Sequence, residues 1–97
     1  MIDESLAKKA ADALSVVALG RWSAARTEIQ DGGTFLLLSI AAEPSVARAL
    51  DSETRKTVAT LLNAVVPKFP TQKSGSWIVC FSRHGVVFES ILPFEAS

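Results

Sequence analysis

The apolar residues change from helical to strand spacing twice along the chain, and this order constrains the fold more than any other feature. A helix is predicted over residues 3–19, because Asp3 and Glu4 suit its positively charged end and Gly20 follows its last turn. Apolar residues at three- and four-residue spacing mark its buried face: Leu6, Ala10, Ala13, Leu14 and Val17.

The next segment is predicted as a hairpin of two strands. Residues 34–40 are an apolar run typical of a strand, whereas residues 21–30 fit either a strand or a further helical turn, since Trp22 and Ile29 also match helical spacing. Asp31, Gly32 and Gly33 tolerate the positive φ of a tight turn, so we prefer the hairpin.

The second half repeats this order. Residues 44–66 are predicted as one helix or as two joined near Asp51, because Pro44 suits a first helical position and Asp51 offers a second start. Pro67 ends the helix, and residues 68–75 form a loop. A hairpin then joins residues 77–82 to residues 86–92 through Arg83, His84 and Gly85.

These elements predict an α+β fold in the order α-β-β-α-β-β. We expect a single layer of about four mainly antiparallel strands with two helices on one face. The 97 residues are expected to form a single domain, since 48% are hydrophobic and 21% charged, as in globular chains that build one core.

Side-chain alternation predicts which residues face the helices and which do not. The set expected to face the helices is Ile29, Leu36, Leu38, Ile40, Val86, Phe88 and Leu92. The opposite face would then carry Arg26, Glu28, Phe35, Leu37 and Glu89. The orientation of residues 77–82 stays open, because both sides of this strand are apolar enough to face inward. One side carries Trp77, Val79 and Phe81, and the other carries Ile78, Cys80 and Ser82.

An uncovered sheet face of mixed polarity is a candidate interaction surface, because contiguous apolar patches are unusual on a monomer. The residues predicted to bind a partner lie on this face or at its rim: Arg26, Glu28, Trp77, Arg83, His84 and Glu89. Two alternatives are that residues 93–95 fold over the face and that a second copy of the chain covers it.

The charge balance bears on the class of partner. Ten Lys and Arg residues against ten Asp and Glu residues give a net charge of zero, which argues against nucleic acid and is compatible with self-association. No apolar run approaches the roughly 20 residues that span a bilayer. The first residues lack the pattern of a signal peptide, so no membrane is expected and a cytoplasmic location is predicted.

Cys80 and His84 are the residues with the most reactive side chains. A single cysteine excludes an internal disulfide and a zinc site of several thiolates, and no spacing indicates a cofactor or a metal. Cys80 lies among large apolar residues and is predicted to be a small buried hydrophobe, and His84 an exposed turn residue. A Cys80–His84 dyad is the alternative.

A basic and aromatic surface is a second alternative. Lys68, Lys73 and Arg83 would gather beside Phe69 and Trp77, as in surfaces that hold single-stranded nucleic acid. We prefer a solvated loop, because only three charges are involved.

By elimination, the preferred function is a non-enzymatic protein-binding module. Small bacterial inhibitors and toxin-immunity proteins, which act by occluding their partner, belong to this class. A structural or regulatory homodimer, a small enzyme that uses Cys80 or His84, and a nucleic-acid binder follow in that order.

Overall fold

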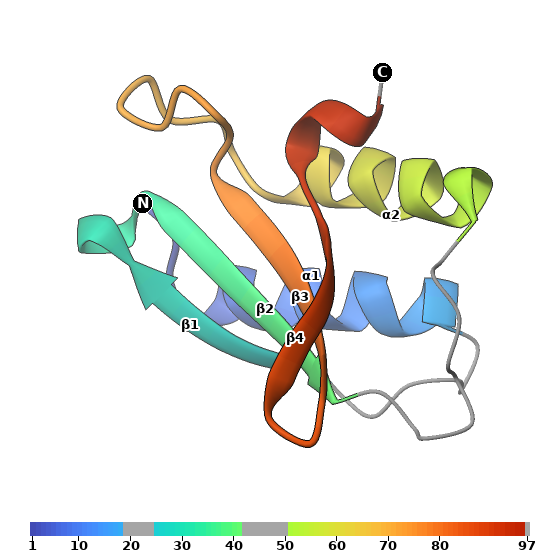
Figure 1. The fold of residues 1–97 in the computed structure, drawn as a ribbon. Helices are drawn as coiled ribbons and strands as arrows, with labels where there is room; N and C mark the ends of the chain where they lie inside the picture. Colours follow the sequence, from blue (N-terminus) through green and yellow to red (C-terminus); the bar gives the residue numbers. More distant parts are fainter. Residues whose placement is uncertain (19–24, 42–50, 97) are drawn as a thin grey trace.

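The structure is a computed structural model that describes residues 1–18, 25–41 and 51–96 (Figure 1). Two α-helices, four strands and two short 3-10 helices follow one another along the chain: α1 (Glu4–Ala18), β1 (Arg26–Gln30), η1 (Asp31–Gly33), β2 (Phe35–Ala41), α2 (Ser52–Val65), β3 (Trp77–Arg83), β4 (Val86–Ile91) and η2 (Pro93–Ala96). The predicted α+β class and the order α-β-β-α-β-β are confirmed. The predicted elements over residues 19–24 and 42–50 lie outside the described residues.

Both helices begin at an aspartate that caps free backbone amides. The Asp3 carboxylate accepts a hydrogen bond from the Leu6 amide at 2.8 Å, and the Asp51 carboxylate accepts one from the Thr54 amide at 2.7 Å. Such caps stabilise a helix by about 1 kcal/mol each. The helix start predicted near Asp51 is therefore confirmed, and α2 ends before Pro67 as expected.

The four strands form one mixed sheet in the order β1-β2-β3-β4. The two outer pairings, β1 with β2 and β3 with β4, are antiparallel hairpins. The central pairing of β2 with β3 is parallel. A parallel pair needs a crossover connection, and α2 lies in the segment that connects these two strands.

The core lies between the sheet and the two helices, which both lie behind the sheet in the view of Figure 1. Burying a leucine, valine or phenylalanine side chain contributes about 1.5–3 kcal/mol, so this layer dominates the stability. The largest fully buried side chains come from both helices and from three strands: Trp77, Phe81, Leu14, Leu36, Leu38, Ile40, Leu62, Ile91, Val58 and Val79.

A bulge in β4 changes which side chains reach this core. Phe81 pairs with Glu89 and Ser82 pairs with Val87, so Phe88 is the extra residue. An extra residue reverses the alternation beyond it. The prediction that Leu92 faces the helices is therefore wrong, and the fully buried residue at this end of the strand is Ile91. Val86 and Phe88 are 68% and 42% exposed rather than covered by the helices.

The two hairpin turns use the backbone conformations that the sequence predicts. Asp31 and Gly32 have φ values of 52° and 66°, and His84 and Gly85 have values of 52° and 78°. These left-handed conformations are common for glycine and for short polar residues.

Among the described helices, none has both the length and the apolar character needed to cross a membrane.

Candidate functional site

The sheet face turned away from the helices is the candidate site, and we call it the open face. Directly paired residues share a face, so the strand register defines the rows across it, and a pair at the β1–β2 turn, Gln30 and Phe35, precedes three longer rows. The first row is Glu28, Leu37 and Ile78, the second is Arg26, Ser39, Cys80 and Ser90, and the third is Ala41, Ser82 and Val87. Ile78, Cys80 and Ser82 thus point away from the core, which settles the orientation that the sequence left open.

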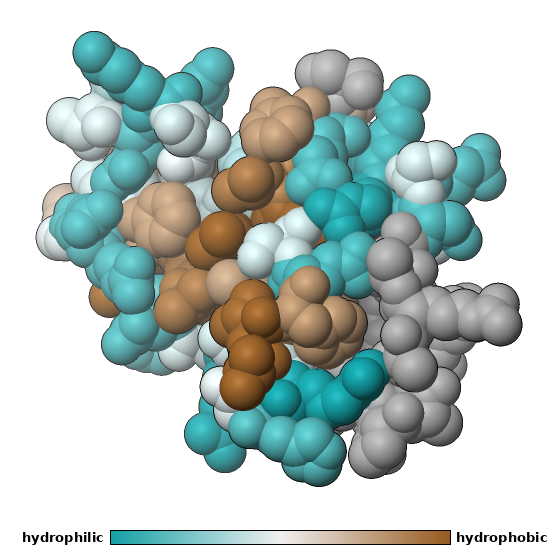
Figure 2. All heavy atoms as spheres, in the orientation of Figure 1, coloured by the Kyte–Doolittle hydropathy of each residue, from teal (hydrophilic) through white to brown (hydrophobic). Residues whose placement is uncertain are grey.

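The open face has an apolar middle and polar sides. Figure 2 shows hydrophobic side chains gathered across the middle of this face, with hydrophilic groups along its borders. Leu37 and Ile78 are only half-buried here, although both belong to the paired central strands. Strands in parallel pairs are usually covered on both faces, so half-exposed apolar residues on this pair mark a surface that a further layer can cover.

A shallow hollow of about 730 Å³ lies over β1, β2 and the end of β3. Small side chains form part of it, namely Ser39, Ala41 and Ser82, while Arg26 and Glu28 line the side formed by β1. Arg26 and Glu28 therefore lie on the face where the sequence predicts them. The Gln30 side-chain amide donates a hydrogen bond to the Glu28 carboxylate at 2.6 Å, which orients that group.

Trp77 was also predicted to contact a partner, and the structure corrects this prediction. Its side chain is 1% exposed and lies in the core between the sheet and the helices. The indole Nε1 donates a hydrogen bond to the Asn63 Oδ1 of α2 at 3.0 Å. Burial and an internal partner for its only polar atom make Trp77 a structural residue.

Glu89 lies on the helix side of the sheet and not on the open face, because the bulge at Phe88 reverses its direction. It forms an ion pair with Arg55 of α2, with 2.5 Å between the guanidinium Nη1 and the carboxylate Oε1. Only 10% of the Glu89 side chain is exposed. The predicted role of Glu89 in partner binding is therefore replaced by a role in joining β4 to α2.

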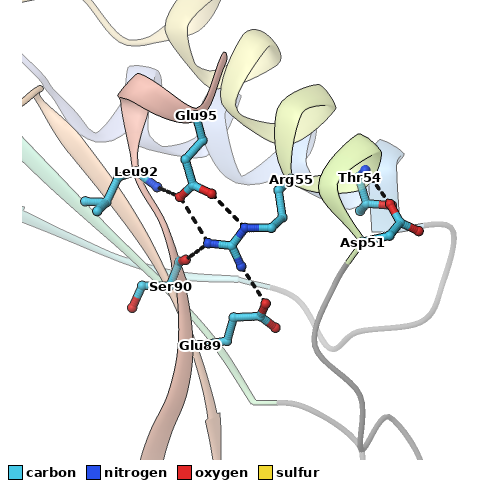
Figure 3. A network of polar contacts seen from close by, with 7 residues as sticks. All are labelled: Asp51, Thr54, Arg55, Glu89, Ser90, Leu92 and Glu95. Carbon is cyan, nitrogen blue, oxygen red and sulfur yellow. Dashed lines mark hydrogen bonds and ion pairs between the residues drawn. The ribbon is translucent and has the colours of Figure 1, made fainter. Parts of the chain in front are cut away.

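Arg55 is the centre of the polar network in Figure 3. Its guanidinium also binds Glu95 of η2, with 2.7 Å from Nε to Oε1, and donates to the Ser90 carbonyl oxygen. The hydrogen bond from Arg55 lowers the pKa of the Glu95 carboxyl group, and a hydrogen bond from the Leu92 amide acts in the same direction. The hydrogen bond and negative charge of Glu95, with those of Glu89, raise the pKa of the Arg55 guanidinium. The network was not predicted, because Arg55 is separated from Glu89 by 34 positions and from Glu95 by 40. A single sequence gives no signal that side chains so far apart in the chain form ion pairs.

This network also decides where the C-terminal segment lies. Glu95 binds Arg55, and η2 packs against α2. The alternative that residues 93–95 fold over the open face is therefore wrong.

Arg83 and His84 lie at the end of the β3–β4 hairpin, which extends beyond β1 and β2 in Figure 1. The Arg83 guanidinium lies 5.0 Å from the centre of the Phe88 ring, a distance typical of a cation–π contact. His84 is exposed in the turn, as predicted. Arg83 pairs with Val86 and continues the side of β3 that carries Trp77 and Phe81, so it belongs to the helix side of the sheet and not to the open face where the sequence predicts it.

Cys80 is half-buried on the open face, which differs from the predicted place in the core. Its Sγ accepts a weak hydrogen bond from the Ser90 hydroxyl at 3.9 Å. Within the described part of the chain, no hydrogen bond joins Cys80 to His84. The two side chains belong to different parts of the hairpin, one to the face and one to the turn.

A second concave surface lies at the other end of β3, and we call it the C-terminal groove. It has a volume of about 360 Å³ between the end of α2, the loop of residues 67–76 and the start of η2. Lys68 and Lys73 line it together with Trp77, as the basic and aromatic alternative predicted, but Arg83 lies at the opposite end of β3. Asn63 and Phe94 also line it, and no local sequence pattern indicates that these two residues meet.

Among the residues that the structure describes, no group of three or more His, Cys, Asp or Glu side chains is arranged to hold a metal ion. Comparison with protein-family models, with curated proteins and with solved structures found no match for this chain.

Proposed function

We propose that the protein is a non-enzymatic binding module that contacts another protein chain through its open face. The observation that carries this proposal is the one-sided cover of the sheet. Both helices pack on one side, while Leu37 and Ile78 remain half-exposed at the centre of the other. Covering such residues with a partner removes apolar area from water at about 25 cal/mol per Å².

The distribution of polarity on the open face supports a protein partner. Protein interfaces have an apolar centre depleted in charge and a polar rim. Here the central strands contribute Leu37, Ile78 and small serines, whereas Arg26 and Glu28 lie on the edge strand β1. Opposite charges at the rim favour a defined orientation of the partner more than they add affinity.

The size of the face sets the expected strength of the contact. Four strands about 4.8 Å apart and about 20 Å long give a flat area of roughly 400 Å². A standard interface buries about 800 Å² on each partner, so the face alone supports a weak or transient complex. Val87 of β4, which is 54% exposed and pairs with Ser82 of the open face, adds apolar area at the border of this face for a tighter one.

Within this class we favour an inhibitor of the kind found among bacterial toxin-immunity proteins, which occludes its partner's site with a rigid surface. A sheet held by a packed core needs little reordering when it binds, and this lowers the entropic cost of association. We propose a cytoplasmic location as well, and the free thiol of Cys80 on the open face supports it because reducing compartments keep such thiols reduced.

Site-specific photocrosslinking tests the proposal. Two variants are made in a Cys80→Ser background, Glu28→Cys on the open face and Lys56→Cys on the exposed side of α2, and each is coupled to a benzophenone maleimide. After irradiation in extract from the source cells, the open-face probe is expected to give a discrete protein adduct that the α2 probe does not give.

A third variant shows whether the adduct depends on the open face. Adding Ile78→Arg to the open-face probe is expected to abolish the adduct, because a charge then replaces a central apolar contact. Circular dichroism confirms that the variant folds. Identical adduct patterns from both probe positions, or an adduct that survives Ile78→Arg, would contradict the proposal.

A further inference from the structure

We propose that the C-terminal groove binds a small anionic ligand that also carries a flat apolar group. Lys68 and Lys73 would hold its phosphate or carboxylate, and Phe94 would contact its apolar part. This site is separate from the open face, and the proposal does not depend on the proposed function. Its volume of about 360 Å³ lies in the range of about 300–1,000 Å³ that small-molecule sites occupy.

The floor of the groove is fixed by hydrogen bonds between three elements. Asn63 of α2 accepts a hydrogen bond from the Trp77 indole at 3.0 Å and donates one to the Pro93 carbonyl oxygen at 3.1 Å. These two bonds join α2 to β3 and to η2. A ligand would therefore meet a floor that is already in place.

The loop that carries Lys73 is held on both sides. The Gln72 side-chain amide donates to Asp31 at 2.8 Å and to Thr34 at 3.0 Å, both near the β1–β2 turn. The Ser76 hydroxyl accepts a hydrogen bond from the Phe69 amide at 3.0 Å. A wall anchored in this way loses little conformational entropy when a ligand binds.

Gly75 brings the loop into direct contact with the start of η2. A Cβ atom at this position would lie 2.3 Å from the Pro93 Cγ, and the φ of 113° itself favours glycine. The two walls of the groove are thus packed together at Gly75. This contact makes the groove a built feature of the fold rather than a gap between mobile segments.

The charge of the groove favours an anion. Of the described residues that line it, only Lys68 and Lys73 are ionisable, and neither forms an ion pair with another described residue. The end of α2 adds a partial negative charge of about one half, which two ammonium groups outweigh. Lysine binds phosphate or carboxylate as a point charge, which suits a groove with no guanidinium in its lining.

The apolar part of the ligand is inferred from Phe94. Its side chain is 66% exposed, although most large aromatic side chains bury their surface. It lies on the wall of the groove beside Pro93. An aromatic face next to two cations is the combination that binds flat anionic molecules by stacking and charge together.

The test is an NMR titration of the ¹⁵N-labelled protein with four probes, namely AMP, adenosine, inorganic phosphate and benzoate. AMP or benzoate, or both, are expected to give saturable shifts at the amides of Lys68, Lys73 and Phe94 and of the neighbouring loop residues at probe concentrations below about 10 mM. The two probes distinguish a phosphate ligand from a carboxylate ligand. Phosphate alone and adenosine alone are each expected to bind at least about tenfold more weakly than the preferred probe.

Matched variants assign the shifts to the groove. The double variant Lys68→Gln, Lys73→Gln is expected to weaken the preferred probe by about tenfold, and Phe94→Ser by about fivefold. The control Lys9→Gln, Lys56→Gln makes the same change in net charge on exposed helix positions and is expected to leave binding unchanged. The absence of saturable shifts with both AMP and benzoate, binding of adenosine as tight as that of the preferred probe, or equal losses in both double variants would overturn the proposal.

Discussion

Replacing Arg55 with methionine is expected to destabilise the protein by about 2–4 kcal/mol. The change removes ion pairs with Glu89 and Glu95 and the hydrogen bond to the Ser90 carbonyl, while methionine keeps most of the apolar stem. Breaking a buried ion pair costs about 3–5 kcal/mol, because the remaining charge stays buried away from water without a partner of opposite charge. The Arg55 side chain is 23% exposed, so solvent screening reduces this value.

Urea unfolding followed by circular dichroism at neutral pH measures this loss. With an m-value of about 1–1.5 kcal/mol per M, the midpoint is expected to fall by about 1.3–4 M. The control is Lys56→Met, which makes the same type of substitution at the next, exposed position of α2 and should change stability by less than about 0.5 kcal/mol. Equal stabilities of the two variants would refute the conclusion that the network joins α2 to β4 and η2.

The same network predicts how stability changes in acid. Arg55 lowers the pKa of Glu95 in the folded state, so the stabilisation from this pair is fully present above the unfolded pKa of about 4.3. It is lost as the pH falls through the lowered folded pKa, because the folded carboxylate must then be protonated. Unfolding measured between pH 7 and pH 2 is expected to show a smaller loss for Arg55→Met than for the unchanged protein. Parallel pH profiles would contradict this linkage.

Two further substitutions test the packing around the C-terminal groove. Gly75→Ala is expected to lower the free energy of unfolding by about 2–4 kcal/mol, because the new Cβ would lie 2.3 Å from Pro93 and the positive φ disfavours alanine. The control Gly32→Ala also has a positive φ but open space around it, so it should cost only about 1 kcal/mol. Equal losses in urea unfolding would show that the contact with Pro93 does not matter. Trp77→Phe is expected to lose about 1–3 kcal/mol, because the Asn63 Oδ1 loses its donor and a smaller ring fills the site; a loss below about 0.5 kcal/mol in thermal unfolding would argue against this hydrogen bond.

Local patterns were sufficient to predict the elements and their order. Three of these features depend on neighbours within a few positions, and all three are found in the structure: the strand predicted over residues 34–40, the turn at Gly32 and the helix start at Asp51. The hairpin that begins in the ambiguous segment 21–30 is present over Arg26–Gln30. Residues 26–30 form a strand because they pair with β2. The glycine turn that follows them was the local signal for this pairing.

The candidate site was predicted only in part. Arg26 and Glu28 are on the open face because regular alternation extends through β1. Glu89 is not, since the bulge at Phe88 reverses the direction of the side chains beyond it, and a bulge has no reliable signal in a single sequence. Cys80 could not be placed, because both sides of β3 carry apolar residues.

The sequence by itself therefore determined the fold class, the two hairpins and the two helix caps, since each arises from interactions between residues close in the chain. The tertiary structure alone decided which face of β3 is buried, that Arg55 of α2 binds Glu89 and Glu95, and that Asn63, Lys73 and Phe94 share one groove. The physical reason is the same in each case. These contacts join segments that lie far apart in the chain, so their energies exist only after the parallel pairing of β2 and β3 has brought those segments together.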